Sequence, residues 1–372
     1  MTGTKTDIPK WFLDKYPKPK LDQLFGSPEG FGYTFFWEFL NLSAHLFIMG
    51  STRSGKTEKK QSVQWWLSRL ETIIEFDSGK PGDIEAYFDS PNPNTKFNKP
   101  VQVLIPWGCH FDIQGVPKDL EYKITPVMAP EQFFDHIEPG WINIISLRNY
   151  FLEEKNLKRY LIQIFHRFDQ RARLGEFNRF CPCTMSFEEA HSMMGTQSIS
   201  TDIESIILTQ FLSRWQREMA ACRIRNLIIT QRFKDVPGPI RENSPCYIVC
   251  RGVNVENSDH PLIHWLSGFA RKALPRQGWW IIDGRHFYSD RPMRFPHFEI
   301  PPNIKITYSG FDDGEKDLET EELFPELGRL TSITQTDLIR SSLAKEDLPE
   351  DLPDLGIYSK YIPKRTGVKN AI

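Results

Sequence analysis

Residues 48–60 read IMGSTRSGKTEKK, and the eight residues from Gly50 to Thr57 fit the pattern G-x-x-x-x-G-K-[ST]. In such a loop, glycines permit a tight turn, and backbone N–H groups and a helix start converge on a phosphate. The Lys56 ammonium would reach the β- and γ-phosphates of a nucleotide, and the Thr57 hydroxyl would ligate Mg²⁺. The pattern therefore predicts a nucleotide site made of Gly50, Ser51, Thr52, Arg53, Ser54, Gly55, Lys56 and Thr57.

The residues around this loop have the order strand, loop, helix, strand. An apolar run at 45–50 precedes the loop, residues 56–70 carry apolar side chains at helical spacing, and a second apolar run follows at 72–79. This is the βαβ unit that a phosphate loop needs. Asp77 ends the second run, and we expect its strand to lie next to that of the loop. Whether it orients a water molecule or caps a turn stays open.

Alternating strands and helices continue over residues 45–290. Further strands are expected at 101–108, 141–148, 183–191, 226–232, 246–253 and 278–284. Helices are expected at 151–175, with an apolar stripe of Leu152, Leu157, Leu161, Ile164 and Phe168, and at 201–224, opened by a capping box of Thr201 and Glu204. Residues 81–99 have the composition of a surface excursion. The alternation predicts one α/β domain with a mostly parallel sheet flanked by helices.

Composition divides the chain into three parts. The first ~30 residues carry repeated Pro, Gly and Lys, which is typical of an irregular arm. Residues 311–355 contain 14 acidic and 4 basic residues, a net charge of −10, so the remainder of this chain of net charge −2 sums to +8. We therefore expect an N-terminal arm at 1–43, an ATPase domain at 44–308 and an acidic tail or lid at 309–372. A mildly basic body suits a polyanionic partner.

The cysteines and the apolar runs indicate in which cellular compartment the protein is expected. No C-x-x-C pair occurs among the six cysteines, so reduced thiols on buried strands are favoured over a metal site or a disulfide. No apolar run approaches the ~20 residues that cross a bilayer. We expect no membrane segment and a cytoplasmic location.

Polar side chains follow two of the expected strands. Glu188 and Glu189 lie toward the end of the strand expected at 183–191, and Gln231 lies toward the end of the strand expected at 226–232. Because parallel strands end at one edge of a sheet, these groups should face the phosphate loop. Hydrolysis needs an acid on the metal side, assigned to Glu188, and a base, assigned to Glu189, while Gln231 would contact the γ-phosphate or its water. A solvated pair of glutamates is the alternative, and His191 is either a γ-phosphate relay or structural.

These motifs, in this order, resemble the HerA/FtsK superfamily of DNA-pumping ATPases over about residues 44–295. The diagnostic parts are Glu189-Ala190-His191 and the Thr230-Gln231-Arg232 run followed by Asp-Val-Pro. The resemblance implies a RecA-like P-loop NTPase core, ATP and Mg²⁺ as cofactors, double-stranded DNA as partner and a homohexameric ring. By matching position it assigns Gly50 to Thr57 as the phosphate loop, Glu188 and Glu189 as the Walker B pair and Gln231 as the sensor.

The sequence departs from the family pattern at three places. Glu188 stands where the family has an aspartate, and Arg53 stands where it usually has glycine. No motif identifies the arginine that acts on the neighbouring subunit's nucleotide. Arg217 and Arg251 are the catalytic candidates that we carry forward, with Arg214 and Arg223 as further ones.

The expected function is therefore an ATP-driven DNA translocase, for example in genome packaging or conjugative transfer, with a nuclease or portal-type protein as a further partner. The alternatives are a VirB4-like protein-secretion ATPase, a terminase-type viral packaging motor and a nucleotide switch. The basic and aromatic stretch 166–180 is a candidate DNA contact, although an ordinary solvated helix face is the favoured interpretation.

Overall fold

The computed structural model describes residues 39, 45–80, 82–93, 95–151, 153–174, 181–190, 203–219, 222–253, 255–256, 260–274, 277–282, 287–288, 293–295 and 297–310. These residues all belong to the first of two units, Met1–Phe324, and the second unit, Pro325–Ile372, lies outside them. Of the expected acidic tail only residues 309 and 310 are described.

The centre of the fold is an eleven-stranded sheet in the order β11-β10-β9-β1-β8-β7-β2-β6-β3-β5, with β12 paired to β10. All eight strands from β9 to β5 pair in parallel, and β10 is antiparallel to β9. The strands are β1 (Leu46–Met49), β2 (Thr72–Phe76), β3 (Val101–Pro106), β5 (Tyr122–Val127), β6 (Ile142–Ile145), β7 (Cys183–Phe187), β8 (Ile224–Thr230), β9 (Cys246–Cys250), β10 (Gln277–Ile282), β11 (Phe287–Tyr288) and β12 (Met293–Arg294).

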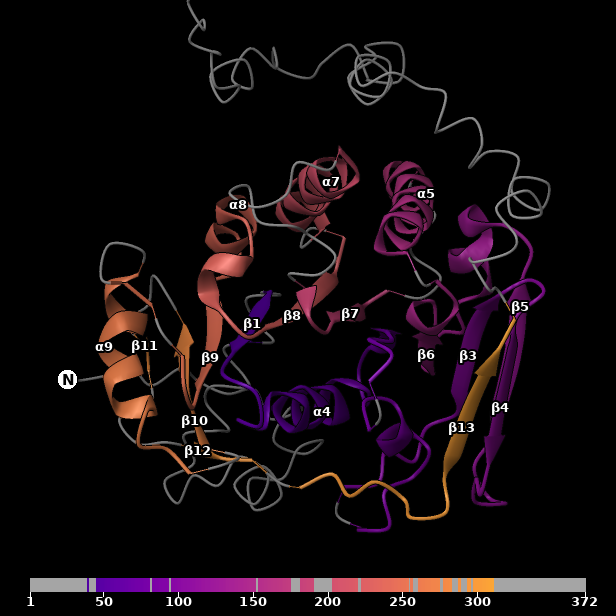
Figure 1. The fold of residues 1–372 in the computed structure, drawn as a ribbon, viewed down its shortest axis with the longest axis horizontal. Helices are drawn as coiled ribbons and strands as arrows, with labels where there is room; N and C mark the ends of the chain where they lie inside the picture. Colours follow the sequence, from indigo (N-terminus) through magenta and orange to yellow (C-terminus); the bar gives the residue numbers. More distant parts are fainter. Residues whose placement is uncertain are drawn as a thin grey trace, which may run out of the picture. The chain divides into compact units, whose positions relative to one another are not determined.

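Helices cover both faces of this sheet. Figure 1 shows α4 on one face and α5, α7 and α8 on the opposite face, with α9 at the end of the sheet that carries β9 and β10. Because a parallel sheet is covered on both sides, its strands are buried on both faces, and β1, β7, β8 and β9 are buried over their whole length. The helices are α4 (Lys56–Leu67), α5 (Glu154–Arg173), α7 (Ile203–Met219), α8 (Gly238–Glu242) and α9 (Pro261–Ala270).

The predicted α/β class and the predicted strands are confirmed, but one expected neighbour relation is wrong. The strand that ends at Asp77, β2, does not lie next to β1, because β8 and β7 lie between them. The crossover through α4 thus passes over two strands. Adjacent strands in the sequence need not be adjacent in a sheet, and hydrophobic periodicity carries no information about strand order.

The expectation that residues 81–99 form a surface excursion is also wrong. Side chains of this segment are buried, namely Ile84, Ala86, Tyr87, Phe88 and Phe97. They cover α4, whose residues from Lys59 to Leu67 are all buried. The Trp65 indole donates a hydrogen bond to the carbonyl oxygen of Lys96 at 2.6 Å. A helix with polar residues buried on its outer side needs a cover, and this segment provides it despite its Pro- and Asn-rich composition.

The two long helices match their predicted positions closely. In α5 the stripe residues Leu157, Leu161, Ile164 and Phe168 are buried, as predicted, while Leu152 lies outside the described residues. Phe165 and Phe168 pack edge-on against Trp215 of α7, with ring centroids 5.0 Å and 4.3 Å away. Thr201 of the expected capping box also lies outside the described residues. Its partner Glu204 accepts a 2.9 Å bond from Arg159 of α5.

Smaller elements complete the described part of the chain. A separate two-stranded antiparallel sheet, which the sequence did not predict, consists of β4 (His110–Gln114) and β13 (Lys305–Ser309). Short 3₁₀ helices are η1 (Glu85–Tyr87), η2 (Pro130–His136), η3 (Arg148–Tyr150) and η5 (Phe233–Asp235). The strand β13 ends at Ser309, where we expect the acidic tail to begin.

Residues ahead of the phosphate loop contribute to the core at the start of the sheet. The Phe39 ring is fully buried and lies 4.3 Å from the guanidinium of Arg225, which begins β8. This guanidinium also donates to the Phe39 carbonyl oxygen at 3.1 Å and pairs with Glu71 at 3.0 Å. Phe39 thus contacts the sheet through an arginine that also forms a buried ion pair.

The cysteines are free thiols, and Cys183, Cys246 and Cys250 lie on buried strands, in agreement with the favoured interpretation. The described residues contain no group of three or more His, Cys, Asp or Glu that could hold a metal ion. Among them, no helix has both the length and the apolar character needed to cross a membrane.

Candidate nucleotide-binding site

The loop between β1 and α4 is anchored to both neighbouring strands. The Gly50 amide donates to the carbonyl oxygen of Thr230 at the end of β8, at 3.3 Å, and the Ser51 amide donates to that of Arg251 after β9, at 3.0 Å. The backbone turns through left-handed conformations at Arg53 (φ 61°) and Gly55 (φ 79°). A left-handed conformation costs free energy for any residue other than glycine. This is a physical reason why the resembling family usually has glycine at the position of Arg53.

Two glycines allow the chain segments to approach each other here. A Cβ atom on Gly50 would lie 2.5 Å from the Ser54 hydroxyl and 2.6 Å from the Cys250 Cβ. A Cβ atom on Gly252, which has a φ of 76°, would overlap the Ser51 hydroxyl. Gly252 is therefore part of the loop's surroundings, although the sequence analysis did not single it out.

Lys56 folds back over the loop from the first position of α4. Its ammonium donates to the carbonyl oxygens of Gly50 and Ser51 at 2.9 Å and 3.0 Å. Burial lowers the pKa of Lys56, and the charges of Glu189 and Glu188 oppose this shift. The lysine predicted to bind phosphates thus lies against the loop, and the charges of both predicted catalytic acids raise its pKa against the effect of burial.

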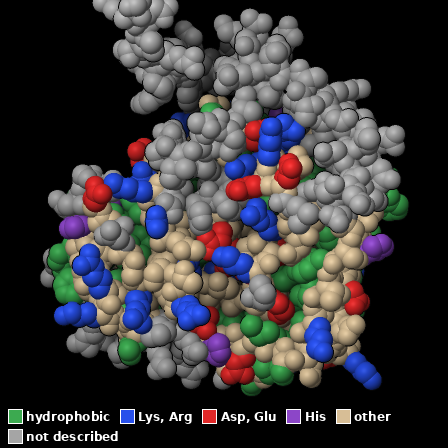
Figure 2. Space-filling view, viewed as in Figure 1, with side chains coloured by type: hydrophobic (Ala, Val, Ile, Leu, Met, Phe, Trp, Pro, Cys, Tyr) green, Lys and Arg blue, Asp and Glu red, His purple; other side chains and the backbone are tan. Residues whose placement is uncertain are grey.

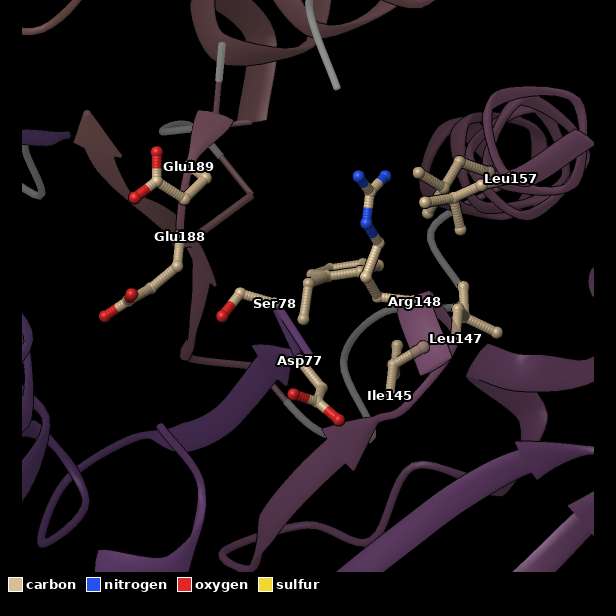
Figure 3. A pocket seen from close by; sticks show the side chains of 10 residues that line it. Asp77, Ser78, Ile145, Leu147, Arg148, Leu157, Glu188 and Glu189 are labelled. Carbon is tan, nitrogen blue, oxygen red and sulfur yellow. The ribbon is translucent and has the colours of Figure 1, made fainter. Parts of the chain in front are cut away.

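The two glutamates after β7 point in different directions, as Figure 3 shows. Glu188 is buried, lies 3.1 Å from the Lys60 ammonium and accepts a hydrogen bond from the Thr57 hydroxyl. Glu189 has a left-handed backbone, with φ 49°, and its side chain is 14% exposed. Burial, helped by the charge of Asp83, raises the pKa of Glu188 to about 7, against the opposing effect of Lys60.

The residues predicted to hold Mg²⁺ fit such an ion chemically. The Thr57 hydroxyl and the Glu188 carboxylate lie in hydrogen-bond contact, beside the loop that would hold the phosphates. Hydroxyl and carboxylate oxygens are the ligands that Mg²⁺ takes in phosphate sites, together with phosphate oxygens and water. The extra methylene of Glu188, compared with aspartate, does not separate the carboxylate from Thr57.

Glu189 is held by side chains from both neighbouring strands. The Gln231 amide nitrogen, after β8, donates to its two carboxylate oxygens at 3.2 Å and 3.3 Å. The Lys80 ammonium, in the turn after β2, forms an ion pair with the same carboxylate. Gln231 in turn accepts a 3.3 Å bond from the Thr52 hydroxyl. A polar chain therefore runs from the phosphate loop to β2. Lys80 was missed, although its position just after an apolar strand is a usable signal.

Asp77 caps a turn, which is one of the two roles left open. Its carboxylate accepts 2.8 Å bonds from the Gly79 amide and the Ser146 hydroxyl and a 3.3 Å bond from the Tyr308 hydroxyl. Burial, and next the charge of Asp83, raises the pKa of Asp77 to about 7. It also lines a small pocket at the strand ends (Figure 3), whose lining is Phe76, Asp77, Ser78, Ile145, Leu147, Arg148, Leu157, Leu161, Glu188 and Glu189.

A buried charge cluster, which the sequence did not predict, lies behind the two glutamates. The Lys60 ammonium of α4 contacts Glu75 and Asp83 at 2.6 Å each, as well as Glu188. Burial alone would lower the pKa of Lys60, but the three carboxylates hold it well above its usual value. Glu75 also accepts hydrogen bonds from Gln64, Tyr87 and Ser186. This cluster connects the helix after the phosphate loop to β2, β7 and residue 83.

The candidate arginines lie at different edges of the sheet. Arg251 is exposed and follows β9 directly beside the loop. Arg217 is exposed in the last turn of α7, which leads to the start of β8, so it lies at the edge opposite the loop. Arg223 is exposed at that same edge, and Arg214 pairs with Asp169 of α5.

Two further predicted elements are only partly described. His191 lies outside the described residues, as do residues 175–180 of the basic and aromatic stretch. Within the described part, His166 and Arg167 are exposed on α5 and Arg171 pairs with Asp135. This arrangement fits a solvated helix face as well as a DNA contact.

No protein-family model matches the chain, and no curated protein matches it. Similar solved structures include the pCW3 conjugation coupling protein TcpA with ATPγS, at 14% identity over 69% of this chain and 61% of that one, with a TM-score of 0.39. The genome packaging NTPase B204 from Sulfolobus turreted icosahedral virus 2, with sulfate, is 7% identical over 68% of this chain and 97% of that one, with a TM-score of 0.42. The cytoplasmic domain of the Thermomonospora curvata type VII secretion ATPase EccC is 9% identical over 70% and 26%, with a TM-score of 0.40.

This chain thus spans about 61% of the coupling protein's length and nearly all of the packaging NTPase. The fold itself follows from the sheet. The strand of the phosphate loop is separated from the strand of the two acids by one strand, β8, which carries Gln231. With the loop after β1 and helices on both faces, the chain has the RecA-like P-loop NTPase fold that the sequence resemblance implies.

Proposed function

We propose that this chain is the ATPase subunit of a HerA/FtsK-type ring motor that hydrolyses ATP and moves double-stranded DNA, as in genome packaging or conjugative transfer. The observation that carries the proposal is the meeting of five side chains at one edge of the sheet, from three different strand ends. These are Lys56, Thr57, Glu188, Glu189 and Gln231.

Each group has a distinct role in the proposed hydrolysis. Lys56 binds the β- and γ-phosphates, and Thr57 with Glu188 holds Mg²⁺, which would neutralise charge on the phosphates when bound. Glu189 accepts the proton of the attacking water, and Gln231 orients that water or contacts the γ-phosphate. Because Gln231 and Glu189 are hydrogen bonded, both act on one small volume.

In a ring, a neighbouring subunit can supply the arginine that acts on the γ-phosphate. No sequence motif identifies this arginine. Arg217 is exposed at the edge opposite its own loop, so from that position it can serve only a neighbouring subunit. Arg251 lies beside its own loop and is the second candidate. An arginine acting across a subunit interface accelerates phosphoryl transfer by ~10³-fold or more.

Surface charge supports a polyanionic partner. Figure 2 shows Lys and Arg side chains gathered on the side that carries α9, with Asp and Glu toward the middle of this face. Residues 261–274, which form α9 and the turn after it, contain no Asp or Glu, and their Arg271 and Lys272 are exposed. Such a surface binds phosphates without reading bases, so affinity for DNA should fall steeply with salt.

The first test is ATP hydrolysis by the full chain with and without double-stranded DNA. We expect DNA to stimulate turnover, and we expect Lys56→Ala and Glu189→Gln to reduce turnover by ~10²-fold or more. Glu189→Gln should still bind nucleotide, whereas Lys56→Ala should not. Glu121→Gln, at an exposed position on the far side of the sheet, is the matched control.

The outcomes separate the alternatives. Turnover that both substitutions abolish but that ignores DNA would replace the DNA motor by a protein-secretion ATPase of the VirB4 kind or a nucleotide switch. A terminase-type motor would add DNA cleavage to DNA-stimulated turnover. Absence of both nucleotide binding and turnover in the unaltered chain would disprove the proposal.

A further inference from the structure

Lys80 connects the turn after β2 to the proposed catalytic base. Its ammonium pairs with the Glu189 carboxylate, and the two side chains are 49% and 14% exposed, respectively. The lysine therefore reaches the glutamate from the solvent side, where a nucleotide would enter. None of the roles assigned above uses this lysine.

The backbone that carries Lys80 is fixed, so any change of partner is confined to its side chain. Asp77 accepts a bond from the Gly79 amide at 2.8 Å, one residue before the lysine. Ser78 donates from both its amide and its hydroxyl to Asp83, at 3.3 Å and 2.7 Å. A lysine side chain has four rotatable bonds beyond this anchored turn, which is enough to move its ammonium between neighbouring acceptors.

Two side chains, one from each side, hold the proposed base Glu189, and both are of types that can bind phosphate. β2 and β8 are the two neighbours of β7, and they contribute Lys80 and Gln231 to the same carboxylate. An ammonium and an amide N–H are both hydrogen-bond donors, and each can donate to a phosphate oxygen in place of a carboxylate oxygen. In this structure, both donors engage the Glu189 carboxylate.

The charges of Lys80 and Glu189 both act on Lys56, in opposite directions. The three charged groups therefore lie within electrostatic range of one another. A γ-phosphate bound by Lys56 would enter this range carrying more negative charge than the Glu189 carboxylate. Since lysine binds phosphate as a point charge, the ammonium of Lys80 would be drawn from the carboxylate to the γ-phosphate.

We propose that Lys80 is a γ-phosphate-binding residue that exchanges partners: it pairs with Glu189 when no triphosphate is bound and with the γ-phosphate when ATP is bound. The exchange frees the base to accept a proton from water only after the substrate has arrived. ADP lacks the γ-phosphate and leaves the pair in place. This inference rests on the proposed nucleotide site, and it adds to that site a way to distinguish ATP from ADP.

The test is equilibrium binding of ATPγS and of ADP, each with Mg²⁺, to the full chain. Lys80→Ala should weaken ATPγS binding by about tenfold, the equivalent of ~1.4 kcal/mol, and should change ADP binding by less than about twofold. Lys80→Arg keeps the charge and should restore most of the ATPγS affinity. Lys118→Ala, at an exposed lysine far from the loop, should change neither affinity.

A second pair of variants tests the exchange itself. Glu189→Gln removes the negative charge that competes for Lys80, so ATPγS should bind several-fold more tightly, on the order of 1 kcal/mol. In the double variant Lys80→Ala, Glu189→Gln, this gain in ATPγS affinity should be absent, because the ammonium that would bind the γ-phosphate more readily has been removed. A gain of the same size in both backgrounds would refute the exchange.

The controls separate failure of this inference from failure of the nucleotide site. If Lys56→Ala abolishes binding of both nucleotides while Lys80→Ala affects them equally or not at all, only the role of Lys80 is wrong. If the unaltered chain binds neither nucleotide, both proposals are wrong. Because the side chain of Lys80 is half-exposed, Lys80→Ala should melt within a few degrees of the unaltered chain, and Lys80→Arg supplies the same comparison at preserved charge.

Discussion

One methylene separates Glu188 from the aspartate that the resembling family has at this position, and the structure shows where the longer side chain reaches. The Glu188 side chain contacts the hydroxyl of Thr57, the last residue of the phosphate-loop pattern, and the ammonium of Lys60, which lies further along α4. The longer side chain therefore keeps a carboxylate oxygen beside Thr57. At this scale, residue type and position after a strand were enough to place both glutamates near the phosphate loop, and their catalytic roles stay a prediction.

Two glycines with the same backbone conformation should respond differently to an added methyl group. Gly252 and Gly140 both have a φ of 76°, but a Cβ on Gly252 overlaps Ser51 while one on Gly140 meets nothing within 4 Å. Both alanine variants should lose ~1 kcal/mol of stability to strain. Only Gly252→Ala should also weaken ATPγS binding, by about tenfold or more, because the loop must shift.

Thermal unfolding and nucleotide titration of the two variants measure these effects separately. Equal nucleotide affinities in Gly252→Ala and Gly140→Ala would show that the loop does not depend on its contact with residue 252.

The helix α4 shows what the sequence could and could not predict at the scale of an element. Its apolar residues Val63, Trp66 and Leu67 correctly predict a helix after the loop. The burial of Lys60 and Gln64 on the same helix was not predictable, because their partners come from β2, β7 and residue 83. Polar residues at helical spacing normally indicate a solvated face, and only the tertiary structure shows that this face is covered.

Removal of the buried cation from this cluster should be costly. Lys60→Met leaves three carboxylates without their shared partner and should lower the free energy of unfolding by ~3–5 kcal/mol. Lys123→Met removes an ion pair with Glu138 in which both side chains are 40% exposed, and it should cost less than ~1 kcal/mol. Denaturant unfolding monitored by tryptophan fluorescence compares the two.

Partial rescue would identify the mechanism. Because uncompensated charge causes the loss, adding Glu75→Gln to Lys60→Met should recover part of the stability. The interpretation is wrong if Lys60→Met costs no more than Lys123→Met, or if the second substitution only adds to the loss.

For the whole molecule, the class of fold and the edge that carries the site were predictable, because both follow from local patterns. Apolar runs ending in Gly50, Glu188 and Gln231 are enough to place those residues together once the sheet is parallel. The order of strands, the cover formed by residues 82–99 and the pair of β4 with β13 depend on contacts between distant segments. Lys80 falls between the two groups: its position after an apolar strand is visible in the sequence, but its pairing with Glu189 becomes apparent only when β2 and β7 are known to be neighbours.

The stability of the whole fold should depend on pH through His45, which precedes β1. Its Nδ1 accepts a bond from the Asn226 amide at 3.0 Å, so its Nε2 donates to the Gln216 carbonyl oxygen at 2.5 Å. Burial lowers its pKa from 6.5 to about 4. Between these values the unfolded chain binds a proton that the folded chain does not, so stability falls as pH decreases from about 6.5 toward 4.

This one group should account for a loss of ~2 kcal/mol between pH 7.5 and pH 5. His45→Gln retains a donor and an acceptor but does not titrate, so its unfolding free energy should lack this part of the pH slope. Asp77 and Glu188, with raised pKa values, act in the opposite direction in both proteins and cancel in the comparison. Identical pH slopes for the two proteins would exclude His45 as the cause.

The contact between Phe39 and Arg225 sets a limit for shortening the chain from its N-terminus. A chain that starts at residue 39 retains both groups that contact the Arg225 guanidinium, the aromatic ring and the carbonyl oxygen of Phe39. Removal of residue 39 as well takes away both contacts and opens the Arg225–Glu71 pair to water. Two deletions that differ by a single residue therefore yield polypeptides with different solvent access at the start of the sheet, at the edge opposite the phosphate loop.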